Sequence, residues 1–430
     1  MPTSQLWSKK SLHSVLRQTD TWNPAYKPRS CIRYIDVSAI SNERLEITEA
    51  KSISGASAPS RARKIVKSGD TIFATIRPSL RRIAQVPPEL HNEIASTAFC
   101  ILRANRDCID QRYLFFSVCN DSFITSVADL ETGASYPAVR DTDILEQEIV
   151  IPPLNEQKKI SFVLSALRKR FLQQFACIQN ATDLKRAAMH KLFTCGLRGE
   201  PQKETEIGLV PESWICKELG DIVDIEYGIQ AAVANATDPS IGSLILTNVN
   251  IELDGTINLD KRRYYKVPSR ANERYTLRKG DVLFNWRSGS SNHVGKTAYF
   301  DLDGDFTYSS FILRFRPRTP VLAKYLYRWL RKLHGIGFFS SKRNVSSINS
   351  VFNASLSATI PIYFPHNEPE QQEIVDILDA IDSKIDLHRR KKAVLEELFK
   401  SMLHKLMSGE VRVDDLDLSA LSPQDNEEKT

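Results

Sequence analysis

The sequence has only seven cysteines in 430 residues, and none of them are spaced as Cys-x-x-Cys. Their odd number and scattered positions argue against a disulfide framework and a zinc cluster, so we expect reduced cysteines that mostly pack in the interior. No apolar run approaches the roughly 20 residues that a membrane span requires. The first residues, MPTSQLWSKKSLHS, are polar where a signal peptide carries its apolar stretch. We therefore expect a cytoplasmic protein with no membrane partner.

Familiar catalytic motifs are also missing. The segment from Gly289 to Lys296 resembles a phosphate-binding loop, but five residues separate its glycines where the motif has four, and no helix is predicted after it. The eight histidines show no paired spacing for a metal, and no Gly-x-Ser-x-Gly sequence is present. The sequence therefore disfavours ATP binding, metal binding and serine hydrolase chemistry.

Two further near-matches fit turns better than chemistry. Asn23-Pro24-Ala25-Tyr26 resembles the Asn-Pro-Pro-Tyr motif of amino-methyltransferases, but an alanine replaces a proline and no glycine-rich cofactor turn lies nearby. Asp301, Asp303 and Asp305 could suggest a metal-dependent nuclease, yet around Gly304 they are more typical of a hairpin turn. We therefore expect a chain that is not an enzyme, with no catalytic residues, no metal and no bound cofactor of its own.

What is present is the composition of an ordinary globular protein, 42% hydrophobic and 26% charged. At 430 residues the chain exceeds one comfortable core, which predicts at least two domains. The formal net charge of +6 suits an anionic partner such as a nucleic acid, but so mild an excess also occurs in proteins without one. Charge alone therefore decides little.

The most informative feature is an internal repeat. The segment that starts at Glu156 matches the segment that starts at Glu370 without a gap. The matches include the pairs Glu156-Gln157 and Glu370-Gln371, and also His190-Lys191-Leu192 and His404-Lys405-Leu406. Prolines precede both segments and glycines follow them, as is typical of helix starts and ends. Each copy is therefore predicted to be one long helix.

Within each copy the apolar residues step by four and three, the heptad spacing of a helix that packs along one seam. A single apolar stripe needs a partner, and each copy is the obvious partner of the other. The first copy is basic and the second is acidic, which favours pairing as an antiparallel coiled coil over two solvated helix faces. The residues predicted to pair are Ile160, Leu164, Leu167, Phe171 and Leu192 in the first helix and Ile374, Leu378, Ile381, Ile385 and Leu406 in the second.

The regions before the helices correspond at a similar shift, as diverged copies. Lys67-Ser68-Gly69-Asp70 parallels Arg278-Lys279-Gly280-Asp281, and Ala98-Phe99 parallels Ser310-Phe311. Gly-Asp followed by an apolar run indicates a turn and then a strand. Several such strands with few helical patterns predict an α+β fold, in which two mainly-sheet domains alternate with the two long helices.

The predicted order of the chain has five parts. A first mainly-sheet domain covers residues 1–153 and the first long helix covers 154–200, a second mainly-sheet domain covers 201–366 and the second long helix covers 367–409. Residues 410–430 are acidic and polar, which predicts a disordered tail.

These motifs resemble the specificity subunits of type I restriction-modification systems, over nearly the whole chain. Members of that family carry two target-recognition domains, each ending in an Ile-Pro-x-Pro-x-x-Glu-Gln-like start of a long helix. Residues 151–157, IPPLNEQ, match this start, and residues 360–371 match it with an inserted YFPHNE that changes the local loop. The Lys-x-Gly-Asp motif and residues 208–214, GLVPESW, are similarly typical.

The resemblance implies that each domain reads one half of a split, asymmetric target in double-stranded DNA through the major groove, while the helices set the distance between the domains. It also implies that two methyltransferase subunits dock on the helical region and that restriction subunits join them in a complex that defends against phages. S-adenosylmethionine, ATP and Mg²⁺ are then expected on these partner subunits and not on this chain.

Recognition of bases in the major groove requires polar side chains on loops. Arg is best shaped for the edge of guanine and Asn for the edge of adenine, while Arg and Lys also bind phosphates. Both domains carry such clusters around the predicted strand after the Gly-Asp motif. The DNA-binding candidates of the first domain are Arg61, Arg63, Lys64, Arg77, Arg81, Arg82, Ser135 and Tyr136. Those of the second are Asn285, Arg287, Ser288, Asn292, His293, Lys296, Lys342, Arg343 and Asn344.

Two alternatives to a DNA-reading subunit stay open at this point. One is a specificity-like scaffold that works without a partner, and the other is a diverged methyltransferase. Identical residue types serve base edges, phosphates or solvent depending on their placement. The sequence therefore points to clusters of candidate residues and not to individual base contacts, and it leaves the target sequence open.

Overall fold

The structure, a computed structural model, describes residues 7–23, 30–230, 237–268, 272–318, 321–342, 344–345 and 350–417. The chain forms two compact units: the first combines Met1–Cys177 with His388–Thr430, and the second comprises Ile178–Leu387. The predicted division gives each long helix a segment of its own. The structure instead shares each long helix between the two units.

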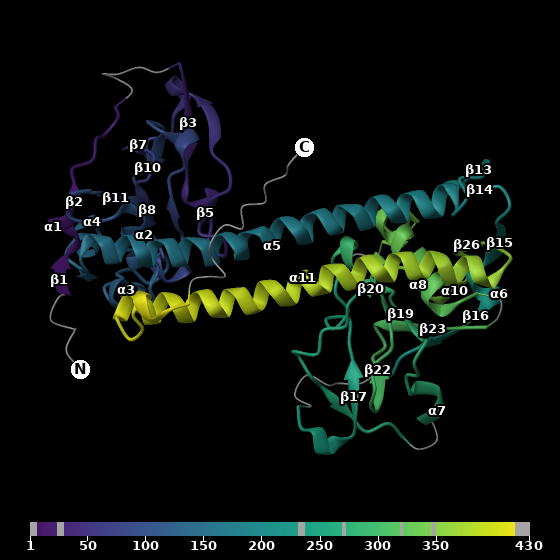
Figure 1. Ribbon diagram of the computed structural model, residues 1–430. Helices are drawn as coiled ribbons and strands as arrows, with labels where there is room; N and C mark the ends of the chain where they lie inside the picture. The colour runs from purple at the N-terminus through teal and green to yellow at the C-terminus, as the bar shows by residue number, and fades with distance from the viewer. Residues whose placement is uncertain are drawn as a thin grey trace. The chain divides into compact units, whose positions relative to one another are not determined.

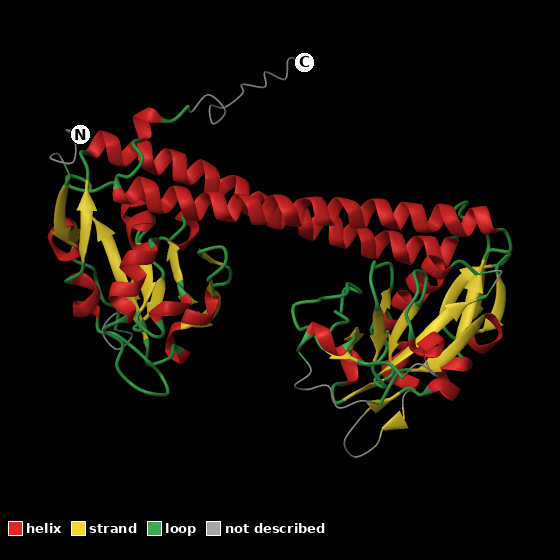
Figure 2. Cartoon of the chain, turned by 90° about the horizontal axis from the view of Figure 1, so that it is seen from below, coloured by secondary structure: helices red, strands yellow, loops and turns green. Residues whose placement is uncertain are grey.

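The two long helices are confirmed as α5 (Leu154–Cys195) and α11 (Glu368–Ser408). Each ends at a glycine with a left-handed backbone, Gly196 and Gly409, which is the residue type that such a helix end favours. In each unit a half of α5 lies beside a half of α11 (Figure 1). The strands of each unit lie to one side of these helix segments (Figure 2).

The helix segments run antiparallel within each unit, as predicted. In the first unit His388, near the start of its α11 segment, hydrogen bonds Gln174, near the end of its α5 segment, at 2.9 Å. In the second unit Lys185 of α5 forms an ion pair with Asp382 of α11 at 2.6 Å between Nζ and Oδ1. In this ion pair the first helix supplies the base and the second helix supplies the acid, as the charge pattern predicts.

The first unit has two four-stranded sheets and two short ribbons of strands. Their orders are β6-β3-β10-β7 and β2-β11-β8-β9, with the pairs β1-β12 and β4-β5. The strands are β1 (Ser8–Ser11), β2 (Leu16–Arg17), β3 (Cys31–Ile35), β4 (Ile40–Ser41), β5 (Glu46–Ile47), β6 (Lys51–Ser54), β7 (Ala62–Ile65), β8 (Thr71–Ala74), β9 (Ile83–Gln85), β10 (Ile94–Ser96), β11 (Phe99–Ala104) and β12 (Glu148–Ile151). Its short helices are α1 (Leu12–Val15), α2 (Gln111–Cys119), α3 (Asp121–Ala128) and α4 (Asp141–Leu145).

The second unit repeats this plan with changes. Its sheets have the orders β16-β23-β19-β21, β18-β17-β22 and β20-β25-β24, with the pairs β15-β26 and β13-β14. The strands are β13 (Gln202–Thr205), β14 (Gly208–Pro211), β15 (Ile215–Glu218), β16 (Val223–Tyr227), β17 (Ser243–Leu246), β18 (Tyr264–Tyr265), β19 (Val282–Asn285), β20 (Arg287–Ser288), β21 (Thr297–Tyr299), β22 (Phe306–Tyr308), β23 (Ile312–Pro317), β24 (Asn344–Val345), β25 (Ser350–Val351) and β26 (Pro361–Phe364). Its short helices are α6 (Leu219–Ile222), α7 (Asn272–Tyr275), α8 (Ala323–Gly335), α9 (Phe338–Lys342) and α10 (Ala354–Ala358).

The pairing of strands corrects one detail of the predicted alignment. Phe99 pairs with Ala74, at the end of β8, whereas Ile312 pairs with Asn285, at the end of β19. Phe99 therefore corresponds to Ile312, and the alignment of Phe99 with Phe311 is wrong by one residue. Phe99 is the first residue of β11 and is buried, whereas Phe311 lies in the turn before β23 and is 40% exposed.

The seam residues of the long helices serve the cores of the two units. Nine of the ten residues predicted to pair are buried and Ile381 is half-buried. Ile160, Leu164 and Leu167 belong to one cluster with residues of α2 and with Leu406 of α11, while Leu192, Ile374 and Leu378 lie in the core of the second unit. Each such side chain contributes about 1.5–3 kcal/mol on burial. The seam thus fastens each helix to its globular domain as well as to the other helix.

The predicted disordered tail starts too early. Residues 410–417 are ordered, with a 3-10 turn at Val413–Asp415, and Val413 is only 2% exposed in the core of the first unit. Asp414 also forms an ion pair with Lys159 of α5 at 2.5 Å. The acidic composition misled the prediction, because Val411 and Leu416 also pack against this core and the segment is held by three apolar residues and one paired carboxylate. Residues 418–430 lie outside the described residues.

The seven cysteines are free, as expected, although Cys31 and Cys216 are exposed and do not pack in the interior. Within the described ranges, no helix has both the length and the apolar character that a bilayer crossing needs.

Candidate nucleic-acid interface

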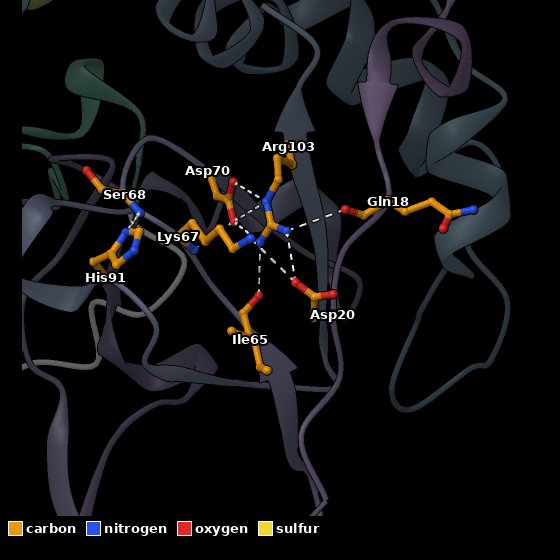
Figure 3. A network of polar contacts seen from close by, with 8 residues as sticks. All are labelled: Gln18, Asp20, Ile65, Lys67, Ser68, Asp70, His91 and Arg103. Atoms are coloured by element: carbon orange, nitrogen blue, oxygen red, sulfur yellow. Dashed lines mark hydrogen bonds and ion pairs between the residues drawn. The ribbon is translucent and has the colours of Figure 1, made fainter.

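The repeated Gly-Asp motif builds an internal anchor in each unit. Asp70 is only 3% exposed. Its carboxylate accepts the backbone N–H of Lys67 at 2.8 Å and binds the Arg103 guanidinium through two nitrogens, Nε at 3.0 Å and Nη2 at 2.8 Å. Figure 3 shows this network, in which Asp20 also approaches Arg103. Gly69 makes the turn possible because its φ of 86° is in the left-handed region.

The second unit reproduces the anchor with the same chemistry. Asp281 is 1% exposed, accepts the backbone N–H of Arg278 at 2.8 Å and binds Arg316 at 2.7 Å and 2.8 Å. Hydrogen bonding to Asp281 raises the pKa of Arg316, which keeps the guanidinium charged. The repeated Gly-Asp motif therefore holds strands together and is not available to a ligand.

The repeated Glu-Gln motif is a second internal anchor. The Gln157 side chain is fully buried, accepts the backbone N–H of Asp110 at 2.8 Å and donates to the Pro152 carbonyl at 2.8 Å. Gln371 does the same in the second unit, between the Leu322 N–H at 3.0 Å and the Pro365 carbonyl at 3.1 Å. Each glutamine ties the start of a long helix to the start of a shorter one, α2 or α8.

Because the matching motifs are internal, the surface differences between the units lie in the loops around β8 and β19. In the first unit the loop after β8 pairs with the segment that precedes α4, through a bridge between Ile76 and Ala138. In the second unit Arg287 pairs with Val351 in the corresponding place. The same frame therefore presents different loop residues in the two units.

Three predicted residues of the first unit come together on this surface. Arg77 Nη2 donates to the Ser135 carbonyl at 3.2 Å, although the two residues are 58 positions apart in the sequence. The Arg77 guanidinium lies 5.4 Å from the centroid of the Tyr136 ring. Tyr136 is 75% exposed. An arginine and an aromatic ring thus form one exposed stack.

Most of the other candidates of the first unit use their charged groups in hydrogen bonds or ion pairs within the protein. Lys64 is not available, because its ammonium donates to the Phe99 carbonyl at 2.6 Å and forms an ion pair with Asp141. Arg82 donates to the Val37 carbonyl at 2.9 Å, and Arg81 pairs with Asp121 at 2.5 Å. The remaining two are Arg63, which donates to the Ala62 carbonyl at 2.7 Å, and the exposed Arg61.

In the second unit two candidates are structural. Asn285 is fully buried and its amide donates to the His293 carbonyl at 2.7 Å. Lys296 is 7% exposed and donates to the carbonyls of Asn248 at 2.9 Å and Ile251 at 2.6 Å. Burial lowers the pKa of Lys296. Neither side chain can enter a groove in this conformation, so these two predictions are corrected.

The other candidates of the second unit differ in exposure. Asn292 and His293 are exposed, and Ser288 is buried with its hydroxyl accepting the Ser290 N–H at 3.2 Å. Arg287 is half-buried, with its guanidinium 5.6 Å from the Phe311 ring centroid. Lys342 pairs with Glu206 at 2.5 Å. Arg343 lies outside the described residues, and of Asn344 only the backbone, in β24, is described.

The near-matches to catalytic motifs have structural explanations. The lysine of the phosphate-loop-like segment, Lys296, is held by two carbonyls, and the segment leads into strand β21 instead of a helix. Asp303 pairs with Lys279 at 2.6 Å, and Asp305 accepts the Ser243 hydroxyl at 2.7 Å, in the turn between β21 and β22. Residues 24–29, which include most of the Asn-Pro-Ala-Tyr sequence, lie outside the described residues.

Sequence reasoning missed the Phe311 ring of the second unit. Phe311 underlies Arg287, and the Trp286 indole donates to the Ser310 carbonyl at 2.7 Å. The sequence signal was an aromatic residue at the turn before β23. The incorrect alignment of Phe311 with the buried Phe99 hid it.

Comparisons with known proteins agree with this architecture. The chain is 26% identical over 332 residues to the type I restriction enzyme MjaVIII specificity subunit of Methanocaldococcus jannaschii, covering 75% of each chain. A solved structure concerned with complex assembly and conformational transition of the type I R-M system is 26% identical, with a TM-score of 0.58 over 94% of this chain and 98% of that chain. The type I S subunit from M. genitalium, at 14% identity, shares the fold with a TM-score of 0.59 over 95% and 98%.

The sequence model of one family matches in two copies. That family is the type I restriction modification DNA specificity domain, and the matched residues are 21–174 and 211–397. The two matches cover most of the two globular domains and much of both long helices. The chain therefore belongs to the family of type I restriction-modification specificity subunits.

Proposed function

We propose that each unit reads one half of a split, asymmetric target in double-stranded DNA. The observation that carries this proposal is the contrast between the internal anchors, which are the same in both units, and the loops around β8 and β19, which differ. One anchor residue of each unit, Asp70 and Asp281, binds an arginine in the same way. An exposed stack of Arg77 and Tyr136 has a different counterpart in Arg287 and Phe311. Two similar frames with unlike reading loops suit two unlike half-sites.

We further propose that the chain is not catalytic and that it is the subunit of a larger complex that recognises the DNA target sequence. Two methyltransferase subunits and restriction subunits would supply the chemistry, with S-adenosylmethionine, ATP and Mg²⁺ bound to them. Membership of the specificity-subunit family supports this division of labour. That the long helices act as spacers between the two domains stays a prediction. That the protein binds its target DNA in the cytoplasm also stays a prediction.

A methylome tests the proposal most directly. A strain that expresses this chain together with its methyltransferase and restriction subunits is sequenced for modified adenines, and a strain without this chain is the control. We expect adenine methylation at one bipartite sequence, lost completely when the chain is deleted. Unchanged bipartite methylation after deletion would refute the proposal.

Two further measurements separate the alternatives. Selection from random-sequence DNA by the purified complex yields a motif if the chain reads DNA, and none if it is a scaffold without a target. Incubation of the purified chain alone with S-adenosylmethionine and DNA measures methyl transfer. We expect no transfer above background, and a turnover that depends on this chain would identify a diverged methyltransferase.

A further inference from the structure

Arg77 differs from the other cationic candidates of the first unit in how its guanidinium is held. The charged groups of three of those candidates meet an acid or a carbonyl: Lys64 meets Asp141, Arg81 meets Asp121 and Arg82 meets the Val37 carbonyl. Among the described residues Arg77 also meets one carbonyl, that of Ser135, but it alone of these four lies against an aromatic ring, and that ring is 75% exposed. Most of its five N–H donors therefore remain available.

The backbone at Arg77 is fixed in an uncommon conformation. Its φ of 48° and ψ of 60° are left-handed, which costs a residue with a side chain roughly 1–2 kcal/mol. Two hydrogen bonds maintain it: the Arg77 N–H donates to the Pro137 carbonyl at 2.8 Å, and the Leu80 N–H donates to the Arg77 carbonyl at 2.9 Å. A strained, well-anchored position that displays an exposed side chain is typical of functional sites.

We propose that Arg77 reads a guanine in the half-site bound by the first unit and that Tyr136 is its positioning residue. This inference rests on the proposed function and deepens it. Arginine recognises guanine through two parallel hydrogen bonds to O6 and N7, which require the guanidinium plane to be aligned with the base. The Tyr136 ring, 5.4 Å from the guanidinium, restricts how that plane can turn. A phosphate contact needs charge but little control of the plane, so the stack favours base reading.

The test compares Arg77 with Arg112 of α2, an exposed arginine of the same unit that is not a DNA-binding candidate and for which the described residues offer no stacked ring. The complete complex with its methyltransferase subunits is prepared with wild-type chain, Arg77→Gln, Arg112→Gln, Tyr136→Ala and Tyr136→Phe. Binding is measured on duplexes that carry the wild-type motif or each single base-pair change, over a range of salt concentrations. The half-site of the second unit serves as an internal control for folding and assembly.

For Arg77→Gln we expect roughly 5- to 150-fold weaker binding to the wild-type duplex and lost discrimination at one G·C pair of one half-site. Preference at that pair shifts toward adenine, which glutamine recognises. Tyr136→Ala weakens discrimination at the same pair with an unchanged salt dependence, whereas Tyr136→Phe keeps the ring and the wild-type motif. Arg112→Gln preserves every base preference.

Two outcomes overturn the inference in distinguishable ways. If Arg77→Gln weakens binding equally for all duplexes and lowers the slope of the salt dependence by about 1, Arg77 contacts a phosphate. A full wild-type motif retained by Arg77→Gln also overturns the inference while the proposed function stands. A wild-type complex that selects no motif overturns the proposed function, and this inference falls with it.

Discussion

Lys332 of α8 offers a sharp test of how burial acts on stability in the second unit. Its ammonium nitrogen is buried, has no hydrogen-bond partner among the described residues and lies 4.6 Å from the centroid of the Trp329 ring. Burial lowers the pKa of Lys332 to about 8. Replacement by methionine keeps an unbranched side chain of similar length and removes the charge. We therefore expect Lys332→Met to stabilise the second unit.

The magnitude follows from the change in pKa. A pKa of about 8 in place of an ordinary value of roughly 10.4 corresponds to about 3 kcal/mol of unfavourable burial at neutral pH. The contact with Trp329 returns about 0.5–1 kcal/mol, which methionine gives up. The net gain is about 2 kcal/mol, or roughly 4–8 °C in the melting temperature of a unit of this size.

The pH dependence gives the reasoning a second check. Below pH 8 the lysine is charged in both the folded and the unfolded state, so the full cost is present. Between pH 8 and about 10 the folded state loses its proton first, so the wild type gains stability as pH rises and the advantage of methionine shrinks.

Calorimetric unfolding of the full chain at pH 7, 8 and 9 measures both effects, with Lys266→Met at an exposed position as the matched control. We expect the control to change stability by less than about 0.5 kcal/mol. A Lys332→Met variant that is less stable than the wild type at pH 7, or a gain that does not decline with pH, would refute the reasoning.

Two further predictions concern the internal anchors, and a third concerns the ion pairs of Asp379 in α11 with Lys324 and Arg328. Gln157→Leu leaves the Asp110 N–H and the Pro152 carbonyl unpaired and should cost the first unit about 2–4 kcal/mol in urea unfolding, whereas the exposed Gln173→Leu should be neutral. Asp70→Asn leaves the Arg103 charge without its main partner and should cost about 3–5 kcal/mol by the same measurement; a loss below about 1 kcal/mol would show that the anchor is dispensable. Burial opposes the charge of Asp379, but hydrogen bonds from Lys324 and Arg328 outweigh it and lower its pKa, so its stabilising effect should be lost as pH falls below roughly 4. A urea midpoint of the second unit that is constant from pH 6 to pH 3 would contradict this last prediction.

The long helices and the duplication were predictable because their signals are local or repeated. A heptad spacing over about 40 residues leaves few alternatives to a helix, and residues such as Leu164 and Leu378 are buried as the spacing predicts. Sheet order was not predictable, because strands of two to six residues pair with strands far away in the chain. β3, for example, lies between β6 and β10, and no local pattern specifies that choice.

The site was predictable as clusters and not as individuals. Lys64 and Arg77 look alike in sequence, since both are basic residues beside apolar strands. Lys64 meets Asp141, which lies 77 positions away, and Arg77 meets Tyr136, so their roles depend on which loop folds against them. Asn285 shows the same limit, because it follows three apolar residues in a strand and becomes fully buried there. Burial of a polar residue is decided by tertiary packing, which its neighbours in sequence do not reveal.

The composition of the first unit has a consequence for protein synthesis. Its core contains Phe399, Leu403 and Leu406, which a ribosome adds only after all of the second unit, Ile178–Leu387, has been made. The second unit is continuous in the chain and can fold as soon as it emerges. The first domain to be translated is therefore the last to be completed. A premature stop near residue 390 would leave the second unit intact and remove part of the core of the first unit. A truncation near the C-terminus would therefore destabilise the N-terminal unit.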